Sequence, residues 1–143
     1  MEKIPVKIKL LHPEAKMPVH ATEGSAGFDI YSIEDTIIQP KETKMIPTGL
    51  SFEIPQGHHL QVWDRSGKAK QSIHAFAGIL DSDYRGELKI LLHNASQEEH
   101  KIEKGDRMAQ ALILPVLQAE FTQVQQLSET ERGTGGFHST GKK

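Results

Sequence analysis

The sequence has 143 residues, and its 17 lysines and arginines against 19 aspartates and glutamates give a formal net charge of -2. A chain of this size predicts one domain with its own core, and a charge so close to balance argues against nucleic acid or an anionic membrane as a partner. The sequence has no cysteine, opens on no apolar run, and has a mean hydropathy of -0.47. We therefore expect a soluble, cytoplasmic protein that folds without disulfides.

Short apolar or alternating runs recur along most of the chain, which is typical of β proteins. The expected strands cover residues 6–10, 28–31, 36–38, 50–54, 60–63, 88–92 and 111–114, with turns at 39–40, 47–49, 55–57, 85–86 and 104–106. One short helix is expected over residues 66–71, with Ser66 as its cap. Helical periodicity is almost absent elsewhere, so the sequence predicts an all-β fold: a β-sandwich, a jelly roll or a barrel.

The chain turns polar after Pro115, and we expect residues 1–117 to form the barrel core and residues 118–143 a C-terminal arm. The arm carries a glycine-rich stretch at 132–141, RGTGGFHSTG, whose arginine and hydroxyls suit phosphate. It lacks the following helix of a usual phosphate loop. A small barrel is filled by its own side chains, so a ligand site belongs at its rim or between subunits, where an arm from a neighbouring subunit could close it.

Acidic, aromatic and basic side chains gather in the segment from Gly78 to Gly86. In a strand Ile79 and Asp81 would share one face, so an aspartate would end an otherwise apolar strand. A carboxylate there can accept a proton from a water molecule held against an electrophile. The alternative is an aspartate that caps a turn beside an exposed Tyr84.

Three other stretches carry groups that suit a phosphate or its cation. Arg65 offers a fork of donors, Ser66 a hydroxyl and Gly67 close access to backbone N–H groups, unless the arginine simply pairs with the preceding aspartate. Gln110 could donate to a phosphate oxygen or satisfy backbone. Asp29 could orient water around a cation or cap a turn.

Two common kinds of catalytic site are disfavoured. The eight histidines have no metal-site spacing, and there is no cysteine to join them. No Gly-x-Ser-x-Gly elbow is present for a serine nucleophile.

Five motifs, in order and spacing, resemble those of the trimeric dUTP nucleotidohydrolases (dUTPases) along nearly the whole chain. They are AGFDI at 26–30, DRSG at 64–67, GILDSDYRGE at 78–87, GDRMAQ at 105–110 and RGTGGFHSTG at 132–141. The resemblance implies a distorted jelly-roll homotrimer with exchanged C-terminal arms, in which each active site is assembled from three subunits. The implied reaction is Mg²⁺-dependent hydrolysis of dUTP to dUMP and pyrophosphate, which limits uracil incorporation into DNA and supplies dUMP for dTMP synthesis.

The resemblance also implies roles in the core. Asp81 would be the base that activates water for attack on the α-phosphorus, and Tyr84 would pack under the deoxyribose. Backbone groups of a hairpin from Ala75 to Tyr84, Ile79 and Leu80 included, would read the uracil edge.

Phosphate and cation contacts are implied in the same way. Arg65, Ser66, Gly67 and Gln110 match phosphate-contacting positions, and Asp29 would hold water on the Mg²⁺ carried by the triphosphate. In the arm, Phe137 would stack over uracil, and the γ-phosphate would be held by Arg132, Ser139 and Thr140.

Two positions depart from the family pattern. Asp64 stands where a proline commonly precedes Arg-Ser-Gly, which predicts weaker triphosphate binding or an Asp64–Arg65 pair that competes with substrate. His138 stands where glycine is usual, so the arm needs a different backbone angle to close, although the imidazole could also donate to phosphate. The loop before Gly78 is slightly shorter than in many relatives.

Two other functions remain open on this fold. A dCTP deaminase needs a carboxylate inside the strand after the hairpin, and residues 88–93 contain none. A non-catalytic regulator would bind dUTP as a signal and dock on a partner, and Asp64 and His138 keep this interpretation open.

Overall fold

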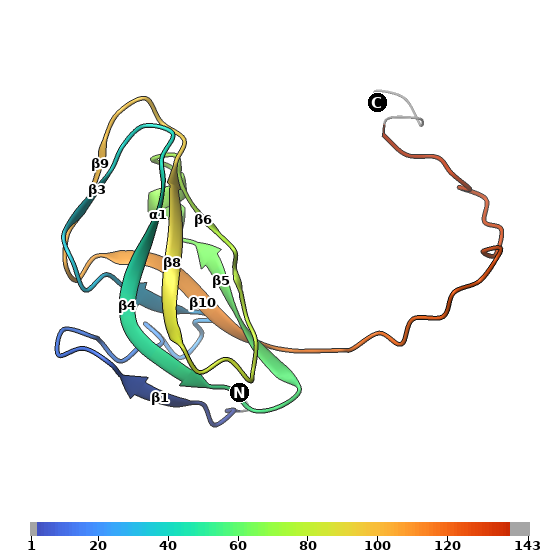
Figure 1. Cartoon of the computed structure of the whole chain (residues 1–143), viewed down its shortest axis with the longest axis horizontal. Coiled ribbons are helices and arrows are strands. Elements are labelled where there is room, and N and C mark those ends of the chain that lie inside the picture. Colours follow the sequence, from blue (N-terminus) through green and yellow to red (C-terminus); the bar gives the residue numbers. More distant parts are fainter. Residues whose placement is uncertain (1–2, 138–143) are drawn as a thin grey trace.

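The structure, a computed structural model, describes residues 3–137 and is built almost entirely of β-strands (Figure 1). In chain order the elements are β1 (Lys7–Leu10), β2 (Phe28–Tyr31), β3 (Thr36–Ile38), β4 (Thr43–Glu53), β5 (His58–Asp64), α1 (Ser66–Ala69), β6 (Ile73–Phe76), β7 (Ile79–Leu80), β8 (Glu87–Asn94), β9 (His100–Ile102) and β10 (Arg107–Pro115).

The strands form two four-stranded sheets, in the orders β1-β4-β8-β6 and β2-β10-β5-β7, and a separate pair, β3-β9. Every paired strand is antiparallel to its neighbour. Two such sheets around one core form a jelly-roll-like sandwich. The all-β, jelly-roll fold expected from the sequence is thus confirmed.

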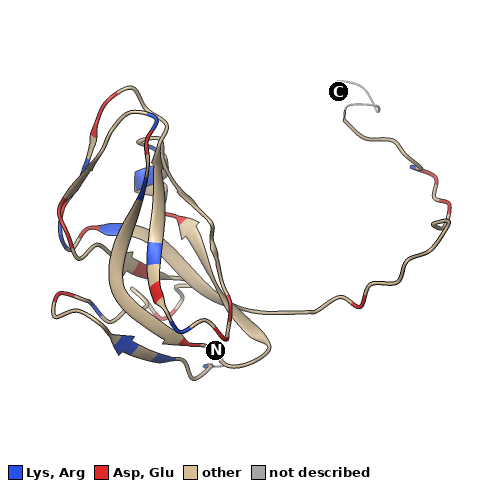
Figure 2. Ribbon diagram, viewed as in Figure 1, with Lys and Arg blue, Asp and Glu red and all other residues tan. Residues whose placement is uncertain are grey.

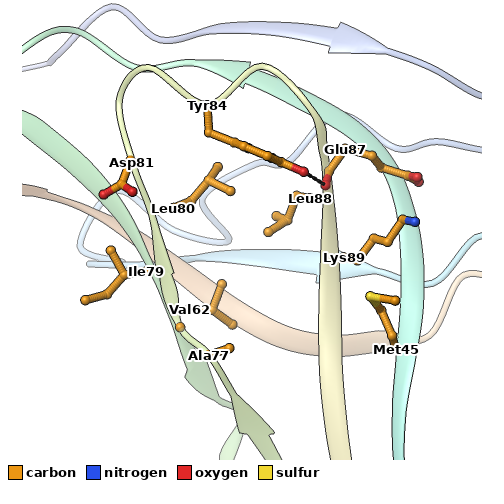
Figure 3. Close-up of a pocket in the computed structure, with 11 residues that line it drawn as sticks. Met45, Val62, Ala77, Ile79, Leu80, Asp81, Tyr84, Glu87, Leu88 and Lys89 are labelled. Atoms are coloured by element: carbon orange, nitrogen blue, oxygen red, sulfur yellow. Dashed lines mark hydrogen bonds between the residues drawn. The ribbon is translucent and has the colours of Figure 1, made fainter.

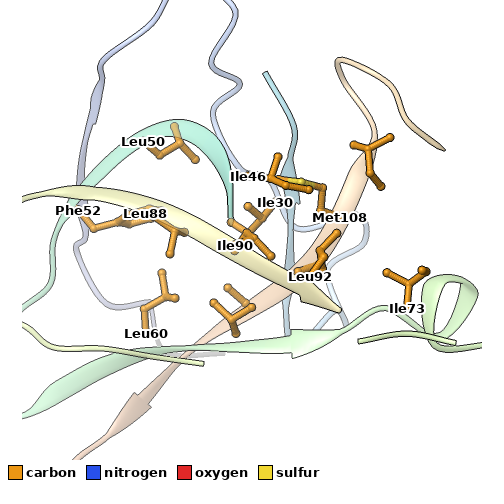
Figure 4. Packing of buried hydrophobic residues seen from close by; sticks show 14 of the residues in the cluster. Ile30, Ile46, Leu50, Phe52, Leu60, Ile73, Leu88, Ile90, Leu92 and Met108 are labelled. Atoms are coloured by element: carbon orange, nitrogen blue, oxygen red, sulfur yellow. The ribbon is translucent and has the colours of Figure 1, made fainter. Parts of the chain in front are cut away.

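The core lies between the two four-stranded sheets (Figure 4). In β8, Leu88, Ile90 and Leu92 are buried, while the residues between them are less so, as period-two alternation requires. They belong to the same buried cluster as Ile30 of β2 and Leu60 of β5. Each fully buried leucine or isoleucine contributes about 1.5–3 kcal/mol, so this alternation holds the sheets together and fixes which residues face outward.

The turn predicted at residues 47–49 is wrong, because these residues lie inside β4 as a bulge. Gly49 has a φ of 69°, which L side chains seldom adopt. Two hydrogen bonds to β8 hold the bulge: Thr48 Oγ1 donates to Leu88 O at 2.6 Å, and Gly49 N donates to Glu87 Oε1 at 2.8 Å. The bulge is therefore stabilised by a carboxylate of the neighbouring strand.

The other expected strands and the helix are present, and all but β2 and β3 differ from the expectation at one or both ends. β2 and β3 match residue for residue, whereas β6 and β9 were not expected. The helix is shorter than expected and begins at Ser66, so Ser66 is not its cap. Arg65 occupies the cap position with φ −88° and ψ 135°, and no side chain of the described residues caps the helix.

The chain leaves the core after β10. Val116 N donates to Gly57 O at 2.8 Å, and from Leu117, which is 97% exposed, the backbone runs away from the sheets (Figure 1). Phe121 and Phe137 are also almost fully exposed. Basic and acidic residues both occur along the core and the extended segment (Figure 2). Within residues 3–137, no helix has the length and apolar character needed to cross a membrane.

Candidate active site

A cleft of about 480 Å³ opens beside β7 and contains the acid and aromatic predicted from the sequence (Figure 3). Ile79, Leu80 and Leu88 contribute apolar surface, and Asp81 and Tyr84 line the cleft from the turn that follows β7. The cleft thus combines an apolar wall with a carboxylate and a phenol, which suits a planar, partly polar ligand.

The path of the chain into this cleft differs from the hairpin expected between Ala75 and Tyr84. β6 pairs with β8 in one sheet, and β7 pairs with β5 in the other, so the chain crosses between sheets at Ala77 and Gly78. Ala77 has a φ of 53°, and a Cβ at Gly78 would lie 2.6 Å from the carbonyl oxygen of Val62. A glycine is required at this crossing, and Asp81 follows a sheet-to-sheet crossover rather than ending a hairpin strand.

Tyr84 is held at the edge of the cleft by local contacts. Its backbone N–H donates to Asp81 O at 3.2 Å, and its phenol donates to Glu87 O at 3.1 Å (Figure 3). The ring covers Gly86, where a Cβ would collide with it. The ring therefore keeps one orientation while 45% of the residue's surface stays accessible.

Asp81 also borders a second cleft, of about 780 Å³. That cleft is lined by polar residues such as Ser82, Asp83 and Arg85, together with His58 and His59 of β5. The exposed Asp81 therefore lines both the cleft beside β7 and this more polar cleft.

The phosphate-contact candidates gather elsewhere, where β5 ends and α1 begins. Arg65 Nε lies 2.8 Å from Asp29 Oδ1, and Arg107 Nη1 lies 3.4 Å from Asp29 Oδ2. The Asp29 side chain is only 15% exposed. Ser66 and Gly67 are exposed at the start of α1, so a donor-rich surface lies over a well-oriented arginine.

Gln110 belongs to the same region but is engaged in the protein. Its Nε2 donates to the carbonyl oxygen of Asp64 at 2.8 Å. Of the two roles considered from the sequence, the structure displays the contact with backbone, which fixes the end of β5 against β10.

The Asp64–Arg65 pair considered from the sequence does not form. Asp64 Oδ2 lies 2.8 Å from His74 Nδ1, and Oδ1 accepts the N–H of Ala75 at 2.5 Å. Because this N–H is bonded to Asp64, a contact from Ala75 to a uracil edge would have to come from another of its backbone groups. His74 is a partner that the sequence motifs did not single out.

Asp81 and Arg65 are far apart within one chain. β7 pairs with β5, and Leu80 lies opposite Leu60. Continued by one residue, this register places Asp81 opposite His59, and His59 comes six residues before Arg65. At about 3.3 Å per residue, the backbone positions of Asp81 and Arg65 are therefore about 20 Å apart along β5. A catalytic base lies within about 3 Å of the atom whose proton it takes, or acts through one water. One chain therefore does not bring the acid and the phosphate-contact candidates into one site.

The glycine-rich end lies away from both groups. Arg132 Nε donates to Gly135 O at 2.8 Å, and Phe137 is fully exposed with a φ of 49°. His138, Ser139 and Thr140 lie outside the described residues. Within residues 3–137, no three His, Asp or Glu side chains are grouped to hold a metal ion, and Asp29 is already shared by two arginines. The donors present thus suit a water-mediated contact to Mg²⁺ better than a site made by the protein alone.

Three residues that were not named as site candidates lie beside Asp29, in α1 or in contact with α1: Arg107, Lys68 and His100. Arg107 reaches Asp29 because β10 pairs with β2, where Arg107 is opposite Tyr31. Lys68 of α1 donates to His100 Nε2 at 3.1 Å and lies 3.8 Å from Asp106 Oδ2, which anchors the helix. Burial, and then the charge of Lys68, lower the pKa of His100. Arg107 stands within GDRMAQ, so the motif was the available signal, whereas His100 offered none.

Comparison with known proteins agrees with this architecture. The family model described as dUTPase matches residues 13–141. The deoxyuridine 5'-triphosphate nucleotidohydrolase of Nautilia profundicola is 54% identical over 140 residues, which cover 96% of this chain and 99% of that protein. A dUTPase structure from Staphylococcus bacteriophage 80alpha with dUPNHPP has a TM-score of 0.88 at 30% identity, covering 96% of this chain and 98% of that one.

A second phage structure bears on the cation. A mutant dUTPase from phage phi11 of S. aureus, described with a structural Mg(II) ion, has a TM-score of 0.81 at 25% identity and covers 87% of this chain and 99% of its own. From the family match and the 54% identical relative, this chain belongs to the dUTPase family.

Proposed function

We propose that this protein is a dUTP diphosphatase that hydrolyses dUTP to dUMP and pyrophosphate with Mg²⁺ and acts as a homotrimer. The observation that carries the proposal is the exposed Asp81 carboxylate in a cleft with apolar side chains along one wall, beside a fixed tyrosine ring. Curated relatives bear the name of this activity. The reaction would keep uracil out of DNA and supply dUMP for dTMP synthesis.

The cleft suits the nucleoside. Ile79 and Leu80 offer an apolar surface to the base, and backbone groups beside them remain candidates for reading its edge. Tyr84 would lie under the deoxyribose, where a ribose 2′-hydroxyl would meet the ring. With the nucleoside seated this way, the α-phosphorus would be near the turn that carries Asp81, which lines the same cleft.

Asp81 would take a proton from the water that attacks the α-phosphorus. A positioned base contributes about 10²–10⁴-fold to such a step. Arg65, with Ser66 and Gly67, would hold the phosphates of the leaving pyrophosphate, and Gln110 would keep this loop in place. Mg²⁺, when bound to the triphosphate, supplies neutralisation of its charge, and Asp29 would contact it through water.

The separation of Asp81 and Arg65 supports active sites that are shared between the subunits of the proposed homotrimer. Because about 20 Å divides them in one chain, the acid of one subunit would need the arginine of another. The extended arm would complete the site: Phe137 would stack over uracil, and Arg132, with Ser139, Thr140 and His138, would close on the γ-phosphate. Such a lid excludes water other than the attacking molecule.

The test is pyrophosphate release from dUTP and Mg²⁺ by the natural chain and by Asp81→Ala. We expect turnover in the natural chain and at least about a hundredfold less in the variant, with binding of a non-hydrolysable dUTP analogue retained. Binding without turnover in both proteins would indicate a non-catalytic regulator instead. Ammonia release from dCTP would indicate a deaminase.

The deaminase alternative has a further observation against it. Glu87, the acid at the start of β8, directs Oε1 to the N–H of Gly49 at 2.8 Å. The carboxylate is thereby committed to the β4 bulge. The regulator alternative loses one of its two supports, since the Asp64 carboxylate contacts His74 and Ala75 and leaves Arg65 to Asp29.

A further inference from the structure

This inference rests on the proposed function. Asp64 lies where three segments that would take part in the proposed reaction meet. It is the last residue of β5, and it directly precedes residues 65–67, which carry the phosphate-contact candidates and are called the phosphate loop below. Its side chain reaches β6, and its carbonyl oxygen accepts a hydrogen bond from Gln110 of β10. One residue therefore joins the phosphate loop, the strand that leads into the nucleoside cleft, and Gln110.

The two carboxylate oxygens have separate partners on β6. Oδ1 accepts the backbone N–H of Ala75 at 2.5 Å, and Oδ2 lies 2.8 Å from His74 Nδ1. Hydrogen bonds that an ionised carboxylate accepts are stronger than hydrogen bonds between two neutral groups. Two bonds to consecutive residues fix the direction of the carboxylate as well as its position.

These contacts explain how an acid is accommodated next to the phosphate-binding arginine. The nearest cation in sequence, Arg65, instead pairs with Asp29 at 2.8 Å. If the Asp64 carboxylate were free to rotate, it would compete with a phosphate for Arg65. Held by His74 and Ala75, it is directed away from Arg65.

We propose that Asp64 and His74 form a latch that positions the phosphate loop against β6, and that Asp64 acts through these neighbours as a positioning residue without touching substrate. The chain leaves β5 at Asp64, passes through α1 and returns in β6, and the latch joins the two ends of this segment. It thereby fixes the start of the crossover that carries Ala77 and Gly78 to the cleft.

The test compares Asp64→Ala, which removes both acceptors, with Asp64→Asn, which keeps an acceptor for the Ala75 N–H. Glu99→Ala is the matched control, because it removes an exposed acid outside both clefts. Displacement of reacting groups by about 1 Å lowers rates by about a hundredfold. We therefore expect kcat for dUTP to fall at least tenfold in Asp64→Ala, and to stay within about threefold of the natural chain in Asp64→Asn and Glu99→Ala.

A second measurement does not depend on catalysis. Hydrogen exchange at the Ala75 amide, followed by NMR in the folded protein, should be slow in the natural chain and in Asp64→Asn and clearly faster in Asp64→Ala. The latch is refuted if exchange is unchanged in Asp64→Ala, or if that variant keeps its kcat while the natural chain is active. If the natural chain has no activity but exchange responds as described, the proposed function fails and the latch contact stands without its catalytic role.

Discussion

The Asp29 carboxylate holds Arg65 in place, with Oδ1 2.8 Å from Arg65 Nε. Arg107 contacts the other oxygen at 3.4 Å, so one acid orients two arginines of the phosphate region. Because the acid is mostly buried while the arginines are partly exposed, this pair is more than a surface contact, although solvent still weakens it.

Replacing this acid should therefore harm substrate binding more than folding. We expect Asp29→Ala to raise KM for dUTP by about tenfold and to lower the free energy of unfolding by about 1 kcal/mol. Steady-state kinetics and denaturant unfolding measure the two effects. Glu53→Ala, which removes an acid from the exposed Lys7–Glu53 pair, should leave KM unchanged. Equal changes of KM in both variants would contradict the role given to Asp29.

Mixing two inactive variants tests whether the active site is shared. Asp81→Ala and Arg65→Ala should each abolish turnover, because each removes one half of the site. If the halves come from different subunits, refolding an equal mixture should restore activity in about a quarter of the sites, since each intact half is present in half of the chains. If one chain held both halves, the mixture would stay inactive.

Local sequence patterns were sufficient to predict strands where the chain stays in one sheet. β2 and β3 were predicted residue for residue from β-branched and aromatic runs between turn formers. The proline and glycine at 47–49 indicated a turn, yet Glu87, far along the chain, binds the Gly49 N–H and allows β4 to continue. Such a partner depends on the pairing of β4 with β8 and has no local signature.

In the candidate site, too, the sequence identified individual residues but not the contacts that depend on the fold. The motifs singled out Asp81, Tyr84 and Arg65, but the spacing could not show that the acid and the arginine lie about 20 Å apart in one chain. Nor could it show that Asp64 contacts His74 and leaves its neighbour to Asp29. These relations arise because the chain crosses between sheets at Ala77 and Gly78, which changes the partners of every residue around the crossing.

The tyrosine ring can be displaced without changing the tyrosine. In Gly86→Ala the added methyl group would collide with the Tyr84 ring, which would leave its place and lose its bond to Glu87 O. We expect the preference for dUTP over UTP, measured as the ratio of kcat/KM values, to fall by about tenfold. Gly24→Ala is the control, since a Cβ there meets no atom within 4 Å. An unchanged ratio in Gly86→Ala would contradict a sugar-sensing role for the ring.

Removal of the terminal motif should separate folding from catalysis. Arg132 bonds within its own turn, and Phe137 is fully exposed, so deletion of residues 132–143 should leave the thermal midpoint of the core nearly unchanged. Hydrolysis of dUTP should slow by about a hundredfold, because the site would remain open to water. A chain lacking only its last two lysines serves as the control. Full activity after the longer deletion would refute the lid.

His100 should make stability depend on pH. Burial lowers its pKa from the ordinary value of 6.5, and the Lys68 ammonium, which donates to Nε2 at 3.1 Å, lowers it further against a smaller opposing effect of Asp106. Between the folded and unfolded pKa values the unfolded chain binds more protons, so stability rises with pH. The contribution of His100 is therefore complete above about pH 6.5 and is lost as the pH falls toward the folded pKa.

Denaturant unfolding at about pH 5.5 and about pH 7.5, at one protein concentration, measures this dependence. We expect the natural chain to lose more stability at the lower pH than His100→Gln, whose amide oxygen can still accept a hydrogen bond from Lys68 but does not titrate. Other titrating groups are common to both proteins, so the difference between the two pH dependences belongs to His100. If the two proteins lost stability in parallel, the partly buried His100 imidazole would not be the group responsible.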